Sequence, residues 1–151
     1  MWYRVFCLDG LEVPGDLLVQ TIKAQDIQVN AEFAPSFADW HSCSLQSGTG
    51  GPIYLERYLL NEDDLRHDLN TWAAWLETAE WSKHAKPLME RVIQTQQLIT
   101  LRKPIDHADE VVLERICLLV VQAIAKLRNG IYQIDDDGWY NPEGELLVRE
   151  Y

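Results

Sequence analysis

An acidic turn near the end of the chain holds the residues whose types and spacing best suit chemistry. Asp135, Asp136 and Asp137 precede a glycine, and Trp139 and Tyr140 follow it directly. Clustered carboxylates could hold a divalent cation weakly or meet a basic partner. An EF-hand loop requires glycine at its sixth position, and no register that starts on one of these aspartates supplies it. Because Asp-Gly is a common pair in hairpin turns, we predict a polar hairpin tip at which the three aspartates, Trp139 and Tyr140 contact a protein partner.

Two further groups of side chains contain possible metal ligands. The first is Asp63, Asp64, His67 and Asp68, and the second is His107, Asp109 and Glu110. A catalytic zinc site usually requires two histidines and a third strong ligand, and the sequence has neither an HxxxH nor an HxH motif. Acidic residues in a first helical turn are explained by the helix dipole. We therefore predict no metal site and no cofactor.

The three cysteines form neither a catalytic nor a disulfide pattern. Cys43 lies two residues from His41, so on a strand their side chains would stand about 7 Å apart, which is marginal for a Cys–His pair. Cys7 and Cys117 lie in apolar runs. The odd number and the lack of a CxxC motif indicate reduced thiols in a cytoplasmic protein. The sequence also lacks the GxSxG elbow of serine hydrolases and the P-loop lysine, so no complete catalytic set is present.

Tryptophan is abundant, with six residues in the chain. Trp72 belongs to an apolar stripe of helical spacing, so we expect it in the core. Trp81 and Trp139 lie in expected turn regions beside acidic residues, where aromatic side chains can anchor a partner or ligand. Both are candidate members of an exposed patch. Trp139 would belong to that patch together with the acidic turn.

The balance of charges restricts the classes of partner. The chain of 151 residues carries 24 acidic and 13 basic residues, a net charge of −11. Nucleic acids and anionic membranes are bound through basic surfaces, so this charge excludes both classes. Residues 104–151 hold ten acidic and four basic residues, which concentrates the charge at the C-terminal end. No run approaches the about 20 apolar residues that cross a bilayer, and the N-terminus lacks a signal-peptide pattern.

The first 60 residues predict the order β-α-β-β-β. Residues 2–8 are apolar on both faces, as in a central strand, and residues 16–24 fit a short helix capped by Asp16. Residues 27–33 alternate between apolar and polar side chains, which is typical of a half-buried strand. Two further strands complete a meander, at 40–46 and 53–60.

The middle of the chain is expected to be helical. The acidic residues 61–64 start one helix, and a second is expected over residues 87–100. The third and most buried helix is expected over residues 108–128, with Asp106 or His107 as its cap. The tail then returns to short strands at 131–134 and 146–148. A chain of this length predicts a single domain over residues 1–151. Together these elements predict an α+β fold in which an antiparallel sheet packs against about three helices and ends in a short C-terminal β-hairpin.

The small size, the concentrated acidity and the incomplete catalytic set favour a non-enzymatic interaction or regulatory module that binds a basic protein partner. Small acidic bacterial immunity proteins and nucleic-acid mimics work in this way, steering onto basic partners through complementary charge. That comparison is one of class only. Two alternatives remain open. One is a small enzyme or ligand-binding domain that uses the three aspartates with His41 or His67 between sheet and helices. The other is a homodimer formed through an exposed sheet edge or helix.

Overall fold

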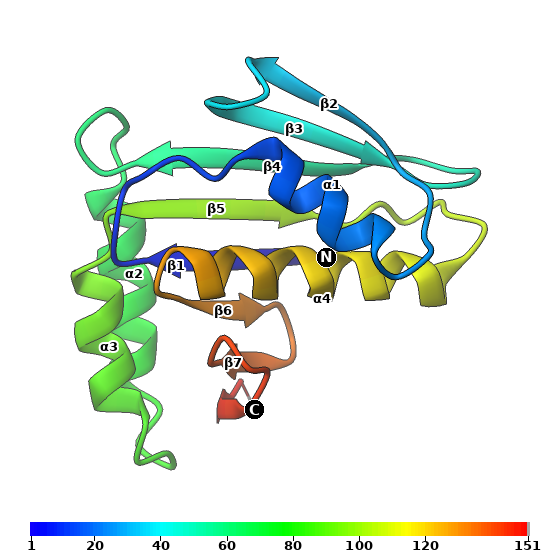
Figure 1. Ribbon diagram of the computed structural model, residues 1–151. Coiled ribbons are helices and arrows are strands. Elements are labelled where there is room, and N and C mark those ends of the chain that lie inside the picture. Colours follow the sequence, from blue (N-terminus) through cyan, green and yellow to red (C-terminus); the bar gives the residue numbers. More distant parts are fainter. Residues whose placement is uncertain (151) are drawn as a thin grey trace.

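An eight-stranded antiparallel sheet forms the centre of the computed structural model, which describes residues 1–150 (Figure 1). The strands lie in the order β2-β3-β4-β5-β1-β6-β7-β8, so β2 and β8 are the two edges. Their bounds are β1 (Trp2–Cys7), β2 (Asn30–Pro35), β3 (Trp40–Gln46), β4 (Ile53–Leu59), β5 (Gln97–Arg102), β6 (Gly130–Ile134), β7 (Gly138–Tyr140) and β8 (Leu146–Arg149). The predicted fold class is confirmed, and the C-terminal strands extend the sheet beyond β1.

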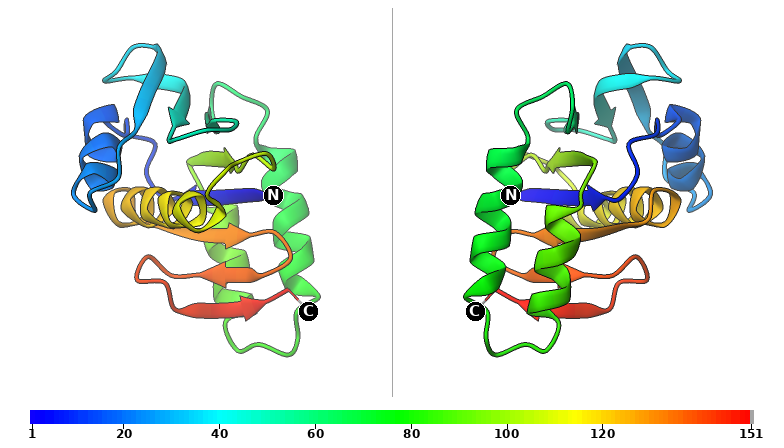
Figure 2. Two further views of the ribbon diagram at one scale, coloured as in Figure 1. Left: turned by 90° about the vertical axis from the view of Figure 1, so that its right-hand side faces the viewer. Right: turned by 90° about the vertical axis from the view of Figure 1, so that its left-hand side faces the viewer.

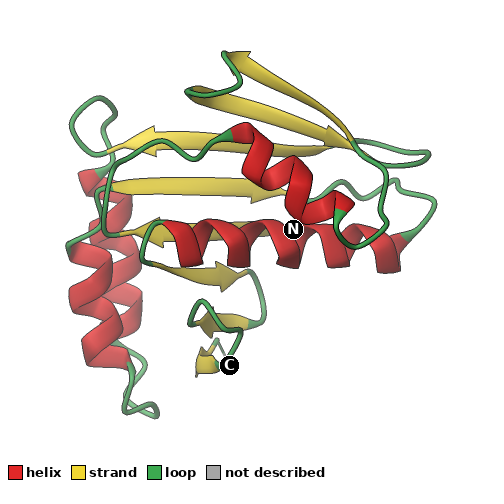
Figure 3. Cartoon of the chain, viewed as in Figure 1, coloured by secondary structure: helices red, strands yellow, loops and turns green. Residues whose placement is uncertain are grey.

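Helices cover both faces of this sheet (Figure 2). They are α1 (Gly15–Lys23), α2 (Arg66–Glu77), α3 (Ala85–Ile93) and α4 (Glu110–Leu127). The pair α1 and α4 lies on one face, and the pair α2 and α3 lies on the other (Figure 3). Side chains alternate between these layers along β1, because successive strand residues point to opposite faces. Val5 and Cys7 face α4, whereas Phe6 packs in the α2–α3 layer. This sandwiched position explains why the first strand is apolar on both faces.

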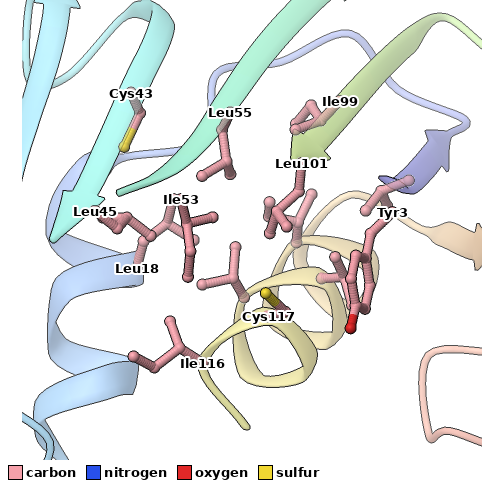
Figure 4. Close-up of a cluster of buried hydrophobic side chains, with 14 of the residues drawn as sticks. Tyr3, Leu18, Cys43, Leu45, Ile53, Leu55, Ile99, Leu101, Ile116 and Cys117 are labelled. Atoms are coloured by element: carbon pink, nitrogen blue, oxygen red, sulfur yellow. The ribbon is translucent and has the colours of Figure 1, made fainter. Parts of the chain in front are cut away.

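The larger buried cluster lies between the sheet and the pair α1 and α4 (Figure 4). Helix α4 contributes seven buried residues, among them Ile116 and Cys117, and α1 contributes Leu18 and Ile22. Fully burying an aliphatic side chain stabilises the fold by about 1.5–3 kcal/mol, so this helix is a major source of stability. The expectation that it is the most buried helix is confirmed. Within residues 1–150, no helix combines the length and the apolar character that a bilayer crossing requires.

The helix expected over residues 87–100 is wrong in its second half. Helix α3 ends at Ile93, and the chain turns into β5, which pairs with β4 on one side and with β1 on the other. Leu98 faces the α2–α3 layer, whereas Ile99 and Leu101 face α1 and α4. A strand that is buried on both faces reads as a continuous apolar run, which resembles a buried helix in sequence.

Four local expectations about element starts also need correction. Helix α1 begins after Pro14, so Asp16 lies in the first turn rather than at the N-cap, and its carboxylate accepts from the Leu17 backbone N–H at 3.0 Å. Helix α4 is capped by Asp109, whose carboxylate accepts from the Val112 backbone N–H at 3.1 Å. Residues 61–64 form a turn before α2, in which the Asp63 carboxylate accepts from the Leu59 backbone N–H at 2.8 Å. Strand β2 begins at residue 30, and residues 27–29 lead into it from α1.

Candidate functional site

The predicted acidic turn connects β6 to β7, and two of its three carboxylates are bound by neighbouring side chains. Asp135 forms an ion pair with Arg4, with 2.6 Å between Oδ1 and Nη1. Asp137 accepts a hydrogen bond of 2.5 Å from the Tyr140 hydroxyl. Asp136 is exposed and has a left-handed backbone with φ of 61°, and its N–H donates to Glu150. The triplet is therefore an ordered turn rather than a free acidic tip.

The fold directs Asp135 and Asp137 toward different layers. Arg4, the partner of Asp135, stacks on the Trp72 ring of α2 at 4.7 Å, so this pair lies on the α2–α3 side. Asp137 instead lines a cleft together with residues of α4, on the opposite side of the sheet. A site on either side of the sheet therefore includes only part of the predicted set.

Trp139 is buried, which corrects the expectation that it belongs to an exposed patch. Its side chain is 0% exposed, and its ring lies 5.2 Å from Phe6, 5.8 Å from Trp72 and 6.3 Å from Trp75. Strand alternation explains this burial, because Trp139 points from β7 into the α2–α3 layer while the next residue, Tyr140, points to the other face. Trp81, the other expected surface tryptophan, is 60% exposed in the connection between α2 and α3.

Asp137 and Tyr140 line a cleft of about 300 Å³ between α4 and the strands β1, β6 and β7. We call it the tyrosine cleft, because three tyrosines from three strands contribute to it. The polar side chains that define it are Tyr3, Glu114, Gln122, Tyr132, Asp137 and Tyr140.

Hydrogen bonds and ring stacking hold one wall of the tyrosine cleft. Tyr132 and Tyr140 are paired across the β6–β7 ladder, and their rings stack with centroids 5.2 Å apart. Gln122 of α4 donates from Nε2 to the Tyr132 hydroxyl at 3.0 Å. Burial, followed by the hydrogen bond to Asp137, raises the pKa of Tyr140. This wall is thus a rigid aromatic surface that ends in a fixed carboxylate.

The Tyr3 hydroxyl contributes an unused polar group to the cleft. Tyr3 is 4% exposed, and within residues 1–150 no side chain or backbone group forms a hydrogen bond with its hydroxyl. Figure 4 shows its ring beside α4 with the hydroxyl directed away from β1. Burial raises the pKa of Tyr3, and nearby acidic groups, including Glu114 and Asp137, raise it further. The hydroxyl is not among the buried polar atoms that lack a partner, so on this largely buried residue it remains open to the cleft, where a ligand can reach it.

Both charged side chains that line the cleft are acidic. Glu114 shares a single cation, Lys103, with Glu110, and the Lys103 Nζ lies 2.5 Å from Glu110 but 3.3 Å from Glu114. Lys103 itself is 8% exposed, whereas both glutamates are more than half exposed. Glu114 and Asp137 are thus the charged side chains that line the cleft, and Glu114 keeps only a long contact with Lys103.

The alternative site that combines the aspartates with a histidine is not assembled. His41 lies on β3, four strand positions from β6, which corresponds to about 19 Å across the sheet. His67 is an exposed residue of α2. The part of the chain that the structure describes has no group of three His, Cys, Asp or Glu side chains arranged to hold a metal ion.

The cysteines are placed as core residues. Cys43 is buried while its neighbour His41 is exposed, and burial raises the pKa of the Cys43 thiol to about 12. Burial likewise raises the pKa of Cys117 to about 12 and that of Cys7 still further. A thiol must ionise to act as a nucleophile, so these thiols are unreactive near neutral pH.

Sequence reasoning found Asp137 and Tyr140 of this cleft but missed the residues that complete it. Glu114 and Gln122 share one face of α4 with Leu118 at spacings of four residues, a pattern that could have been noticed in the helix. Tyr3 lies inside an apolar strand, where nothing in the sequence marks it. Comparisons with protein-family models, with curated proteins and with solved structures find no match to this chain.

Proposed function

We propose that the protein is a non-enzymatic interaction or regulatory module that binds a basic segment of a protein partner in the tyrosine cleft. One observation carries the proposal: carboxylates from two separate elements, Glu114 of α4 and Asp137 of the β6–β7 turn, line the same cleft as the unpartnered Tyr3 hydroxyl. Acidic residues alone would be a solvated surface. A preformed concave site that combines them with an aromatic wall and a hydroxyl available for hydrogen bonding supports binding.

The charge of the whole chain supports the same class of partner. A net charge of −11 attracts basic proteins over distances comparable to the Debye length, about 8 Å at physiological ionic strength. Such steering mainly accelerates association and selects between partners. Residues 104–151 hold the largest excess of acidic residues, and the same segment supplies most of the residues that line the cleft.

Three buried free cysteines support a reducing compartment, so we place this activity in the cytoplasm. Helices on both faces pack on one continuous sheet, which supports a single domain as the functional unit.

A peptide titration tests the proposed function. The probe is a fluorescein-labelled octapeptide in which glycine alternates with lysine and arginine, measured by anisotropy at 0.1 M salt. The double variant Glu114→Gln/Asp137→Asn removes both cleft carboxylates, and we expect about fivefold to tenfold weaker binding, equivalent to about 1–1.4 kcal/mol. Raising the salt to 1 M shortens the Debye length from about 10 to about 3 Å and should weaken wild-type binding as well.

The matched control is Glu62→Gln/Asp64→Asn, which removes the same charge from the exposed turn before α2. Equal binding by the cleft variant and this control would show that the cleft is not the binding site. Affinity capture from the source cell then uses the same three proteins. The physiological partner is the basic protein that the wild type and the control retain and the cleft variant loses.

A further inference from the structure

The tyrosine cleft offers more hydrogen-bond acceptors than its own residues use. Glu114 accepts from Lys103 at 3.3 Å, and Asp137 accepts from Tyr140 at 2.5 Å. An ionised carboxylate has about four acceptor sites, so both groups retain capacity for a ligand. Gln122 uses its amide nitrogen on Tyr132, which leaves its carbonyl oxygen as an acceptor. The Tyr3 hydroxyl adds a further acceptor from β1.

These acceptors face the cleft from different elements, and a flat aromatic wall stands beside them. They come from β1, from α4 and from the β6–β7 turn. The wall is the Tyr132–Tyr140 stack, whose ring planes are inclined by only 11°. A ligand that fills this cleft well must therefore be cationic, donate hydrogen bonds in several directions and have a planar surface.

We propose that the tyrosine cleft recognises the guanidinium group of an arginine in preference to the ammonium group of a lysine. The inference rests on the proposed function, because it names the side chain through which the cleft recognises a basic partner. Arginine presents five N–H donors in a planar fork and stacks on aromatic rings. Lysine presents three donors on a compact, strongly hydrated charge, which has no planar face and is costlier to desolvate.

Tyr3 has a specific role in this preference. Tyr3 as a residue is 4% exposed, and its hydroxyl has no hydrogen-bond partner within residues 1–150, so the oxygen is available to a donor that engages the carboxylates at the same time. The planar set of N–H donors of a guanidinium group can contact the Tyr3 hydroxyl and a carboxylate together. An ammonium group can donate hydrogen bonds in fewer directions. Tyr3 is thus a specificity-determining residue, and Glu114 and Asp137 supply attraction to either cation.

The test compares three fluorescein-labelled pentapeptides that differ only in residues two and four. These residues are arginine, lysine or citrulline between glycines, and citrulline is a neutral analogue of arginine. At 0.1 M salt we expect the arginine peptide to bind at least about tenfold more tightly than the lysine peptide, equivalent to about 1.4 kcal/mol. The citrulline peptide should bind more weakly than either.

The variant Tyr3→Phe removes only the hydroxyl. It should reduce the arginine-to-lysine preference to about twofold or less, while the affinity for the lysine peptide stays within about twofold of wild type. The control Tyr54→Phe removes the hydroxyl of a β4 residue that is 43% exposed and lies outside the cleft, so it should keep the full preference. If Tyr3→Phe does not fold, a measurement on the wild-type protein alone tests the proposal. The arginine Nε–H signal of a ¹⁵N-labelled peptide should shift on binding and exchange more slowly with water.

The outcomes separate this inference from the proposed function. Equal affinities for the arginine and lysine peptides, with both weakened by Glu114→Gln/Asp137→Asn, overturn arginine selectivity and leave the basic-segment module standing. Binding that the cleft variant does not weaken overturns both proposals. A citrulline peptide that binds as tightly as the arginine peptide also overturns the inference. The cleft would then recognise the shape of the side chain and not its positive charge.

Discussion

Tyr132 and Tyr140 stack almost in parallel across the β6–β7 ladder, with ring centroids 5.2 Å apart, and the hydroxyl of Tyr140 holds the carboxylate of Asp137. This pairing joins the acidic turn to the sheet and to α4, because Tyr132 in turn accepts from Gln122. Replacing Tyr140 by phenylalanine keeps the stack and removes the bond to Asp137. We expect a loss of about 1.5–3 kcal/mol of unfolding free energy, since the acceptor is charged. Urea denaturation checks this value, and unchanged stability would show that the bond contributes nothing.

Tyrosine ionisation should limit stability at alkaline pH. Burial raises the pKa of Tyr3, Tyr132 and Tyr140, each above the value near 10 of an unfolded tyrosine. A raised pKa in the folded state means that the neutral form is favoured there. The stability contributed by these groups is therefore complete below pH 10 and is lost as the pH rises through the folded values.

The measurement is a series of urea midpoints between pH 8 and pH 11.5, followed together with tyrosinate absorbance. We expect the midpoint to fall above about pH 10, and the absorbance of the three cleft tyrosines to appear with unfolding. The variant Tyr140→Phe should decline less steeply, because one titrating group is gone. A midpoint that stays constant over this range contradicts the argument.

Replacing Lys103 by methionine should strengthen binding of a basic peptide. Lys103 forms an ion pair with Glu114, so its removal frees this carboxylate for a ligand. We expect a gain of about twofold to fivefold in affinity for the lysine–arginine octapeptide. Stability should change by no more than about 1 kcal/mol, because both glutamates remain solvated and the long apolar stem is preserved. Weaker binding by a folded Lys103→Met protein would show that Lys103 positions Glu114 rather than competing for it.

Trp139 should affect stability and not recognition. Trp139→Ala removes a large side chain from the α2–α3 layer, and we expect a loss of about 3–5 kcal/mol. Trp139→Phe should cost less, since the indole N–H that it removes is buried and has no acceptor within residues 1–150. Peptide affinity of folded Trp139→Phe should equal that of wild type in the anisotropy titration. A clear loss of affinity would restore Trp139 to the binding site.

Local patterns were sufficient to predict most of the sheet. The strand expected over 40–46 and the apolar run of the first strand each match an observed strand closely. The fifth strand was missed because Val92 and Ile99 continue an apolar spacing that also fits a helix. What makes residues 97–102 a strand is pairing with both β4 and β1, and that information lies in distant parts of the chain.

The candidate site shows the same limit. Composition and turn chemistry pointed to Asp137 and Tyr140, and the structure places both in one cleft. It also buries Trp139, because neighbouring residues of a strand point to opposite faces and helices cover both. Tyr3 and Glu114 reach the cleft from the first strand and from α4, a meeting that depends on the strand order rather than on any local motif.

The position of β1 also has a consequence for the order in which the protein can assemble during synthesis. This strand is synthesised before β5 and β6, the two strands with which it pairs. Until residues 130–134 have been made, one hydrogen-bonding edge of β1 has no partner, and its apolar side chains lack the helix that covers them. Such long-range pairing slows folding and leaves nascent chains prone to aggregation. The sheet around β1 can therefore be completed only after residues 130–134 have been synthesised.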